Sequence, residues 1–313
     1  MIERPDVDAL MAGELGQWLA AQGVVREEAR RTSNARFVKA GLIFTPLVIA
    51  VLALGWGGQF TFFLLFVIGA GLGAWAYGPR SAAIQQTKEG INTALAAALG
   101  LAYVHQTEAG AGFQRAKTYR MLPGYSRENF EDLWHGELGG HAFALHEAHL
   151  EQKRSSGKNT HYVTVFRGPV MTIAAGRSFH GVTLVERSGK HQRFGFFGEK
   201  EELEVDGQVL ARVDMVHPGF EDQFTIYSTD QVEARYLAHP TYVEKLIALE
   251  SAFAGQKIRT LFKDGELTVL LETENMFESG NLDAGRDREL VEECVGQFMA
   301  MAELAGALNE ARR

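Results

Sequence analysis

Four histidines fall within fifteen residues of one another, and imidazole is a common metal ligand. They are His135, His141, His146 and His149. The tetrapeptide His146-Glu147-Ala148-His149 approaches the zinc motif HExxH, in which two histidines four positions apart on a helix bind one metal ion. Here the spacing is three, and the neighbouring residues alternate as in a strand, whose successive side chains point to opposite faces. We therefore predict half-exposed strand histidines; the alternative is a metal-dependent hydrolase that uses the His135–His149 region.

A second polar cluster lies in the segment Tyr227–Tyr236, which reads YSTDQVEARY. We expect a short helix here, capped by Ser228 or Thr229, with acidic residues in its first turn, where the helix dipole favours negative charge. The candidate interaction residues are Tyr227, Asp230, Glu233 and Arg235. A well-capped helix packed on a sheet explains the same residues without a ligand, and this is the interpretation that we prefer.

The remaining reactive side chains form no complete catalytic set. The chain has one cysteine, Cys294, which lies on the apolar stripe of the last predicted helix and is expected to be structural. We find no GxSxG elbow, SxxK pair or phosphate-binding P-loop. Adjacent acids such as Glu131 and Asp132 are typical of solvated surface. We predict no catalytic residue, cofactor or metal, and favour a non-enzymatic function while leaving enzymatic activity open.

Two uncharged apolar runs dominate the first quarter of the chain. Ala40–Trp56 has 17 residues and Phe60–Tyr77 has 18, so each is just long enough as a helix to cross a thin bilayer. Only Gly57–Gln59 separates them, which leaves room for a tight turn. Trp56 and Trp75 lie near the ends of the runs, where aromatic residues meet the membrane interface. The sequence therefore predicts a transmembrane helical hairpin.

Glycines in the second run allow two other interpretations. Gly69 and Gly73 have the GxxxG spacing that permits close helix packing, here against the first run, although membrane helices also tolerate glycine without such contacts. Gly69, Gly71 and Ala74 also fit the dinucleotide-binding pattern GxGxxA. That fold needs a helix after the glycines, which Pro79 interrupts, so we prefer the membrane helix.

Basic residues on the flanks of the hairpin indicate its orientation. Five lie in the fourteen residues before the first run, the next two after the second run are close to it, and the connecting turn has none: Arg26, Arg30, Arg31, Arg36 and Lys39, then Arg80 and Lys88. The positive-inside rule then places both termini in the cytoplasm of a protein that crosses the cell inner membrane twice. We predict an N-terminal cytoplasmic amphipathic segment at 1–36, the hairpin at 37–78 and a cytoplasmic domain at 79–313.

The cytoplasmic part alternates with period two from Asn129 to about Gly219, and helical patterns follow it. Strand-length runs are Tyr162–Phe166, Val170–Ala174, Val182–Glu186, Val209–Met215 and Phe224–Tyr227. Pro240 opens a helix, Asp264-Gly265 predicts a β-hairpin turn, and a closing helix covers about Ala284–Glu310. Strands and helices in separate groups predict an α+β fold with a mixed, mainly antiparallel sheet.

Charge is distributed unevenly over this chain of 313 residues with a net charge of −8. Up to Arg80 there are 7 basic and 6 acidic residues, whereas the remainder has 24 basic and 33 acidic ones. No run of basic residues interrupts the acidic part, so we expect no binding to nucleic acid. The content of 46% hydrophobic and 22% charged residues excludes wholesale disorder.

Several short segments resemble a bacterial family filed as domain of unknown function 3137. They are Phe166-Arg167-Gly168, Phe224–Tyr227, the DQVEARY segment Asp230–Tyr236 and Ile258–Phe277. The resemblance covers roughly Asn129–Phe277 and implies a bacterial membrane protein with two hydrophobic segments ahead of an α+β domain. It implies no activity, catalytic residue or cofactor.

Taken with the missing catalytic set, the hairpin predicts a membrane-anchored, cytoplasm-facing binding or scaffold module of unknown ligand. Its expected partners are the lipid bilayer and another protein. The alternative is a membrane-tethered hydrolase of the kind described above.

Overall fold

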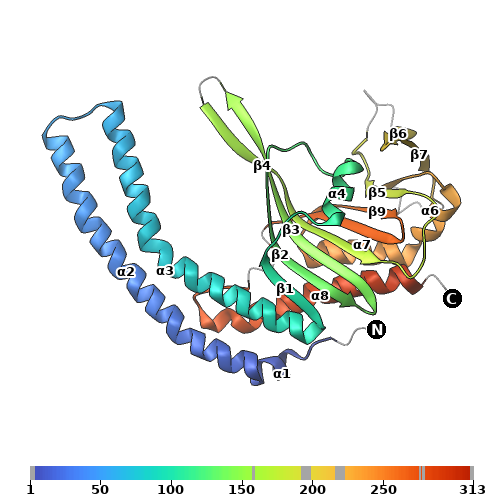
Figure 1. Cartoon of the computed structure of the whole chain (residues 1–313), viewed down its shortest axis with the longest axis horizontal. Coiled ribbons are helices and arrows are strands. Elements are labelled where there is room, and N and C mark those ends of the chain that lie inside the picture. Colours follow the sequence, from blue (N-terminus) through green and yellow to red (C-terminus); the bar gives the residue numbers. More distant parts are fainter. Residues whose placement is uncertain are drawn as a thin grey trace. The chain divides into compact units, whose positions relative to one another are not determined.

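The computed structural model describes residues 4–156, 159–191, 199–215, 223–274, 276 and 279–310. It confirms the predicted α+β fold, with long N-terminal helices followed by a ten-stranded sheet and packed helices (Figure 1). The chain divides into two compact units. We call residues 6–94 with 278–292 the helical unit, and residues 1–5, 95–277 and 293–313 the sheet unit.

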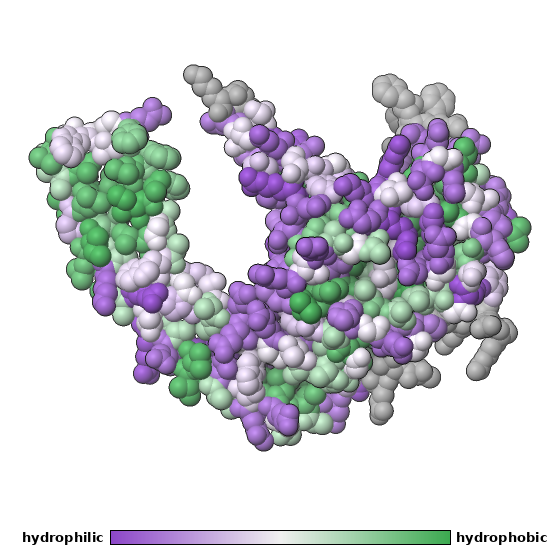
Figure 2. All heavy atoms as spheres, viewed as in Figure 1, coloured by the Kyte–Doolittle hydropathy of each residue, from purple (hydrophilic) through white to green (hydrophobic). Residues whose placement is uncertain are grey.

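The helical unit contains the short helix α1 (Val7–Ala12), α2 (Glu14–Ala53) and most of α3 (Gln59–Leu99). Both α2 and α3 are long and apolar enough to cross a membrane, and only 11% of the most apolar 18-residue window of each is buried. Hydrophobic residues accordingly cover the surface of α2 and α3 near their connecting turn (Figure 2). The helices run without interruption through 36/37 and 78/79, where the sequence suggested domain limits.

The structure of the second apolar run excludes the dinucleotide-binding interpretation of its glycines. Residues 62–68, which would have to form a strand in that fold, lie inside α3. The proposed glycine packing face is half formed: a Cβ on Gly69 would lie 3.1 Å from the ring of Phe44 on α2, whereas one on Gly73 would meet nothing within 4 Å. Only Gly69 therefore needs its small size for contact with the first run.

A segment from the far end of the sequence completes the helical unit. It consists of residues 279–283, the 3₁₀ turn η1 (Ala284–Arg286) and the start of α8 (Asp287–Glu310). Arg26 of α2 is buried and forms a bidentate ion pair with Asp287, with both N–O distances 2.7 Å. Ser279 Oγ donates to Asn92 Oδ1 of α3 over 2.9 Å. These contacts fix the segment to both long helices.

The sheet unit is built on ten strands in the order β1-β2-β3-β4-β10-β9-β5-β8-β7-β6, and the neighbouring strands pair antiparallel. Their bounds are β1 Leu101–Gln106, β2 Arg127–Leu138, β3 His141–Ser156, β4 Asn159–Ala174, β5 Thr183–Arg187, β6 Glu202–Val205, β7 Gln208–Val213, β8 Phe224–Ser228, β9 Gln256–Lys263 and β10 Glu266–Glu272. The predicted runs 162–166 and 170–174 are two parts of the single long strand β4. Hydrogen bonding between adjacent strands brings together residues far apart in sequence.

Helices cover both faces of the sheet. On one face, α7 (Pro240–Ala252) and the second half of α8 pack against apolar side chains of β3, β4 and β10. On the other, α4 (Ala111–Thr118) places Phe113 in the core cluster with Leu150, Phe166 and Leu261. The helix α6 (Gln231–Leu237) follows β8. Apolar side chains are thus buried on both faces of the sheet.

Two backbone features explain the central strands. The predicted hairpin between β9 and β10 is confirmed: Asp264 and Gly265 have φ angles of 53° and 77°, as a tight type I′ turn requires. Gly168 in β4 has a φ of 143°, and a Cβ there would overlap the carbonyl oxygen of Leu271 at the end of β10. The backbone of β10 can approach β4 because residue 168 is glycine.

Candidate functional site

The predicted cluster around α6 is occupied by structural contacts. Asp230 caps the helix, with Oδ1 accepting from the backbone N–H groups of Val232 and Glu233 over 3.0 Å each. The Glu233 carboxylate accepts from the backbone N–H groups of His180 and Gly181 over 2.9 and 2.8 Å. The cap is Asp230, one or two positions after the predicted Ser228 or Thr229, because its carboxylate reaches both free N–H groups.

The other two members of the cluster make contacts elsewhere. Tyr227 on β8 is buried, and its hydroxyl donates to the backbone carbonyl of Lys200 over 3.1 Å. Burial raises the pKa of the Tyr227 hydroxyl above its usual value. Arg235 Nε donates to the carbonyl of Asp214 over 3.1 Å. The contacts agree with a capped helix on a sheet, and an interaction role for these four residues stays a prediction.

The histidine stretch lies on β2 and β3, as its alternation predicted. His146 is buried beside the rings of Phe113 and Phe130, with centroid distances of 6.5 and 5.6 Å. Burial lowers the pKa of His146 to about 4, so its imidazole is neutral at pH 7. His149 Nε2 lies 2.9 Å from Thr164 Oγ1. Glu147 is buried and accepts from Arg167 Nε over 2.8 Å.

His135 is exposed and His141 half-buried. Within the HExxH-like stretch, His146, Glu147 and His149 each contact a different set of residues, so their side chains do not converge on one point. Among the residues that the structure describes, no group of three or more His, Cys, Asp or Glu is arranged to hold a metal ion. The geometry offers the hydrolase alternative no metal centre in the described part of the chain.

A cleft of about 490 Å³ opens on the face of the sheet that carries α4, a volume within the range of small-molecule sites. Its charged lining residues are Arg120, Arg187, Lys190, Lys257 and Arg259 with Glu186 and Glu272. We call it the cationic cleft. Strands β5, β9 and β10 supply its floor, and the segments 120–123 and 187–190 line it further.

Arg259 of β9 is the buried cation of the floor, with 7% of its side chain exposed. Its Nη2 donates to Glu272 Oε1 over 3.1 Å, and Lys257 Nζ donates to Glu272 Oε2 over 2.7 Å. One carboxylate therefore serves two cations. Among the described residues, Arg259 Nε has no hydrogen-bond partner. Burial lowers the pKa of Arg259 from its usual value.

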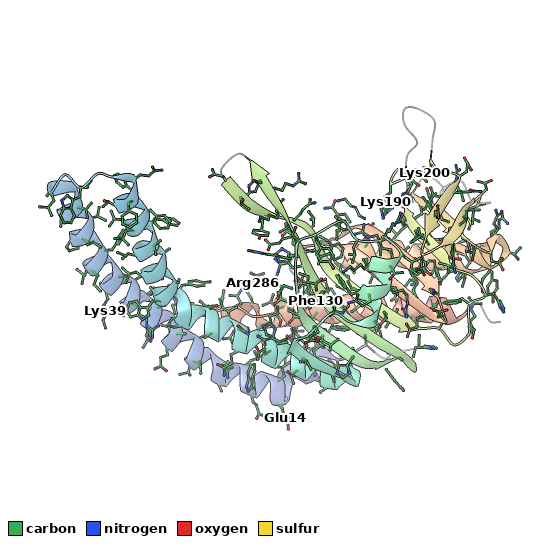
Figure 3. The ribbon with its side chains drawn as sticks, turned by 45° about the horizontal axis from the view of Figure 1, so that its top comes forward. Glu14, Lys39, Phe130, Lys190, Lys200 and Arg286 are labelled. Carbon is green, nitrogen blue, oxygen red and sulfur yellow. The ribbon has the colours of Figure 1, made fainter. Side chains whose placement is uncertain are left out.

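Glu186 of β5 is the buried anion of the floor. Its two carboxylate oxygens accept from Lys190 Nζ and His191 Nε2. Burial alone would raise the pKa of Glu186, but the hydrogen bond from His191 and the charge of Lys190 outweigh it and lower this pKa. Burial also lowers the pKa of Lys190, which is labelled in Figure 3. The charges of the cleft thus form two paired groups, one around Glu186 and one around Glu272, and Glu186 and Arg259 are their buried members.

Other cations and an apolar wall complete the cleft. Arg187 pairs with Glu250 outside the cleft, and its guanidinium lies 4.3 Å from the ring centre of Phe224. Arg120 is exposed at a φ of 52°, and its guanidinium has no hydrogen-bond partner among the described residues. The apolar lining consists of Met121, Leu122, Pro123 and Val165.

The cationic cleft has an excess of positive charge in an otherwise acidic part of the chain. Five lysines and arginines line it, and three carboxylates, those of Glu186, Glu250 and Glu272, pair with its residues. Among the residues that the structure describes, two positive charges of the cleft are left without a matching carboxylate. Such a site attracts anions. The attraction is screened least at Arg259, with 7% of its side chain exposed, and more at Lys257, with 62% exposed, and at the exposed Arg120.

Sequence reasoning missed the cationic cleft because its residues come from distant segments between 120 and 272. A signal was nevertheless present: Glu186 and Arg259 interrupt or end runs of apolar, β-branched residues, in VTLVE and IRTLF. A charged residue in a strand that is otherwise buried needs a partner or a function.

Comparison with known proteins confirms the family resemblance. Residues 164–310 match the model of a family described as protein of unknown function (DUF3137), so the match begins after β3 and extends through α8. Among solved structures, the chain is similar to the crystal structure of the mycobacterial trehalose monomycolate transport factor A, TtfA. The identity is 10% and the TM-score 0.34, over 69% of this chain and 95% of that one, a likeness that carries no argument about fold or function. No curated protein matches the chain.

Proposed function

We propose that the chain is a membrane-anchored, cytoplasm-facing binding module, with α2 and α3 as the anchor and the cationic cleft as the binding site. The observation that carries the proposal is the exposure of the apolar windows of α2 and α3, of which 11% is buried. The core helix of a soluble protein buries such a surface against its own chain, whereas a lipid bilayer covers it in an anchor.

The polar flanks support the cytoplasmic orientation. Arg36 Nη1 donates to the carbonyl oxygen of Trp75 over 3.1 Å, and Arg80 Nη2 donates to Asn34 Oδ1 over 2.6 Å. Basic side chains of both helices thus gather at the same end of the apolar hairpin, while the turn Gly57–Gln59 has none. In the bacterial inner membrane such asymmetry favours the cytoplasm for the basic end.

The binding role rests on the composition of the cationic cleft. Its buried charges give orientation and specificity, and its apolar wall gives contact area, the combination typical of ligand sites. A protein partner for the module stays a prediction.

Reporter fusions test the anchor and its orientation together. Green fluorescent protein fused after residue 313 should fluoresce, and alkaline phosphatase at the same place should be inactive, because that enzyme needs an oxidising compartment. Alkaline phosphatase inserted between Gly57 and Gly58 should be active. The protein should pellet with membranes and leave them only in detergent. Recovery in the soluble fraction, or phosphatase activity at the C-terminus, would contradict the proposal.

A further inference from the structure

We propose that the cationic cleft binds a phosphate monoester that carries an apolar group. This inference deepens the proposed binding function and rests on it for the assumption that the cleft is a ligand site.

The charge balance points to a dianion. Counted over the described residues, the cleft has two positive charges beyond the carboxylates that pair with its cations. A phosphate monoester has a charge of about −1.5 to −2 at pH 7, whereas a carboxylate, a sulfonate or a phosphodiester carries one negative charge. Of these groups, the monoester compensates the excess most fully.

Two cations that line the cleft suit phosphate oxygens. Arg259 is held by Glu272, and Lys190 by Glu186, so both cations are placed before a ligand arrives. A guanidinium presents a planar fork of N–H groups that matches phosphate, and an ammonium group adds a point charge. The exposed Arg120 at the edge of the cleft supplies a cation that no described carboxylate engages.

The size and the wall of the cleft point to more than inorganic phosphate. A volume of about 490 Å³ suits an organic molecule. Met121, Leu122, Pro123 and Val165 offer it apolar contact beside the charged floor. Burying the apolar part of a ligand there adds affinity roughly in proportion to the area removed from water.

Isothermal titration calorimetry on the full chain in detergent micelles tests the proposal with three probes: phenyl phosphate, benzenesulfonate and inorganic phosphate. Benzenesulfonate keeps the ring but has one charge, and inorganic phosphate keeps the charge but lacks the ring. We expect phenyl phosphate to bind at least about tenfold more tightly than either. Absence of binding by phenyl phosphate, or equal binding of benzenesulfonate, would overturn the proposal.

Variants assign the binding to the cleft. Lys190→Gln and Arg120→Gln should each weaken phenyl phosphate binding by about tenfold, since each removes a cation that faces the ligand. Lys245→Gln is the matched control, because Lys245 also pairs with a carboxylate, Glu303, at 2.7 Å, but lies outside the cleft. Arg120 is exposed, so its replacement keeps the test valid if Lys190→Gln fails to fold. Equal losses in the Lys245 and Arg120 variants would refute the assignment.

The phosphate monoester could belong to a soluble molecule or to a lipid headgroup. Repeating the titration in nanodiscs of phosphatidylcholine, with and without phosphatidic acid, separates these sources. Loss of phenyl phosphate binding only in discs that contain phosphatidic acid assigns the site to the lipid, and unchanged binding assigns it to a soluble ligand. If the reporter fusions behave as expected but phenyl phosphate does not bind, the ligand class is wrong while the anchored module stands.

Discussion

Asp230 holds the start of α6 through two backbone N–H groups, and this contact can be tested alone. Asp230→Ala removes the cap and should destabilise the helix locally by about 1 kcal/mol. Hydrogen exchange of the amides in residues 231–237 should then accelerate by about fivefold, as measured by mass spectrometry. Asp230→Asn keeps the capping oxygen and should exchange like the parent chain. Equal acceleration in both variants would mean that charge, not capping, stabilises α6.

His146 makes the stability of the sheet unit sensitive to acid. Its pKa falls from 6.5 to about 4 on folding, so between these pH values the unfolded chain binds a proton that the folded chain does not. Stability should therefore fall as the pH drops from about 6.5 to 4, by up to ~3 kcal/mol.

Thermal unfolding of the detergent-solubilised chain at a series of pH values measures this loss. His146→Leu should lose less stability over that range than the parent chain. His135→Gln changes an exposed histidine and should retain the full loss. If the His146 and His135 variants show the same pH dependence, the buried imidazole is not the cause.

At this scale, the sequence could predict local contacts but not distant ones. The acids of the first turn of α6 follow from spacing, and Asp230 does bind the N–H groups within its own helix. Glu233, by contrast, accepts from His180 and Gly181, more than fifty positions away. The spacing of residues along the sequence gives no indication that these segments meet.

Among the elements, β4 and β10 depend on Gly168. Gly168→Ala places a Cβ against the carbonyl oxygen of Leu271 and leaves an alanine at a φ of 143°, which L-residues rarely adopt. We expect the change to lower the free energy of unfolding by about 3 kcal/mol or more. Gly207→Ala is the matched control, because Gly207 also has a positive φ, 69°, but open space around it. The thermal midpoint should fall by about 10 °C for the first and about 3 °C for the second. Similar shifts in both would show that backbone strain alone matters.

Whether a contact between elements could be predicted depends on how far apart in the sequence its residues lie. The turn Asp264-Gly265 was predictable because its φ angles and its flanking apolar runs are local. The cationic cleft was not, because it depends on β5 lying beside β9 and on β9 beside β10. That strand order arises from tertiary packing, so Glu186, Arg259 and Glu272 meet only in the folded sheet.

For the whole molecule, the proposed anchor predicts how the chain responds to a charge. Val67→Lys places an ammonium group near the middle of the second apolar run, which costs about 3 kcal/mol of insertion free energy. We expect a smaller fraction of the protein to resist alkaline extraction from membranes. Val104→Lys, a change on β1, is the matched control, since Val104 is 46% exposed and Val67 48%. Equal extraction of both variants would argue against lipid around α3.

Average composition describes the whole molecule less well than its parts. The chain is acidic, with a net charge of −8, yet its cleft gathers an excess of cations. The apolar hairpin was visible from the sequence because it is one continuous stretch. The cleft was invisible because folding, and not the order of residues, concentrates its charge.

Cys294 gives the protein a built-in reporter of its own opening. It is the single cysteine of the sequence and lies on α8 with 3% of its surface exposed, four residues before the fully buried Phe298. A thiol in that position reacts with an alkylating reagent only when α8 moves away from its neighbours. The rate at which Cys294 is alkylated therefore measures how often this part of the core opens, without any introduced label, in detergent or in membranes.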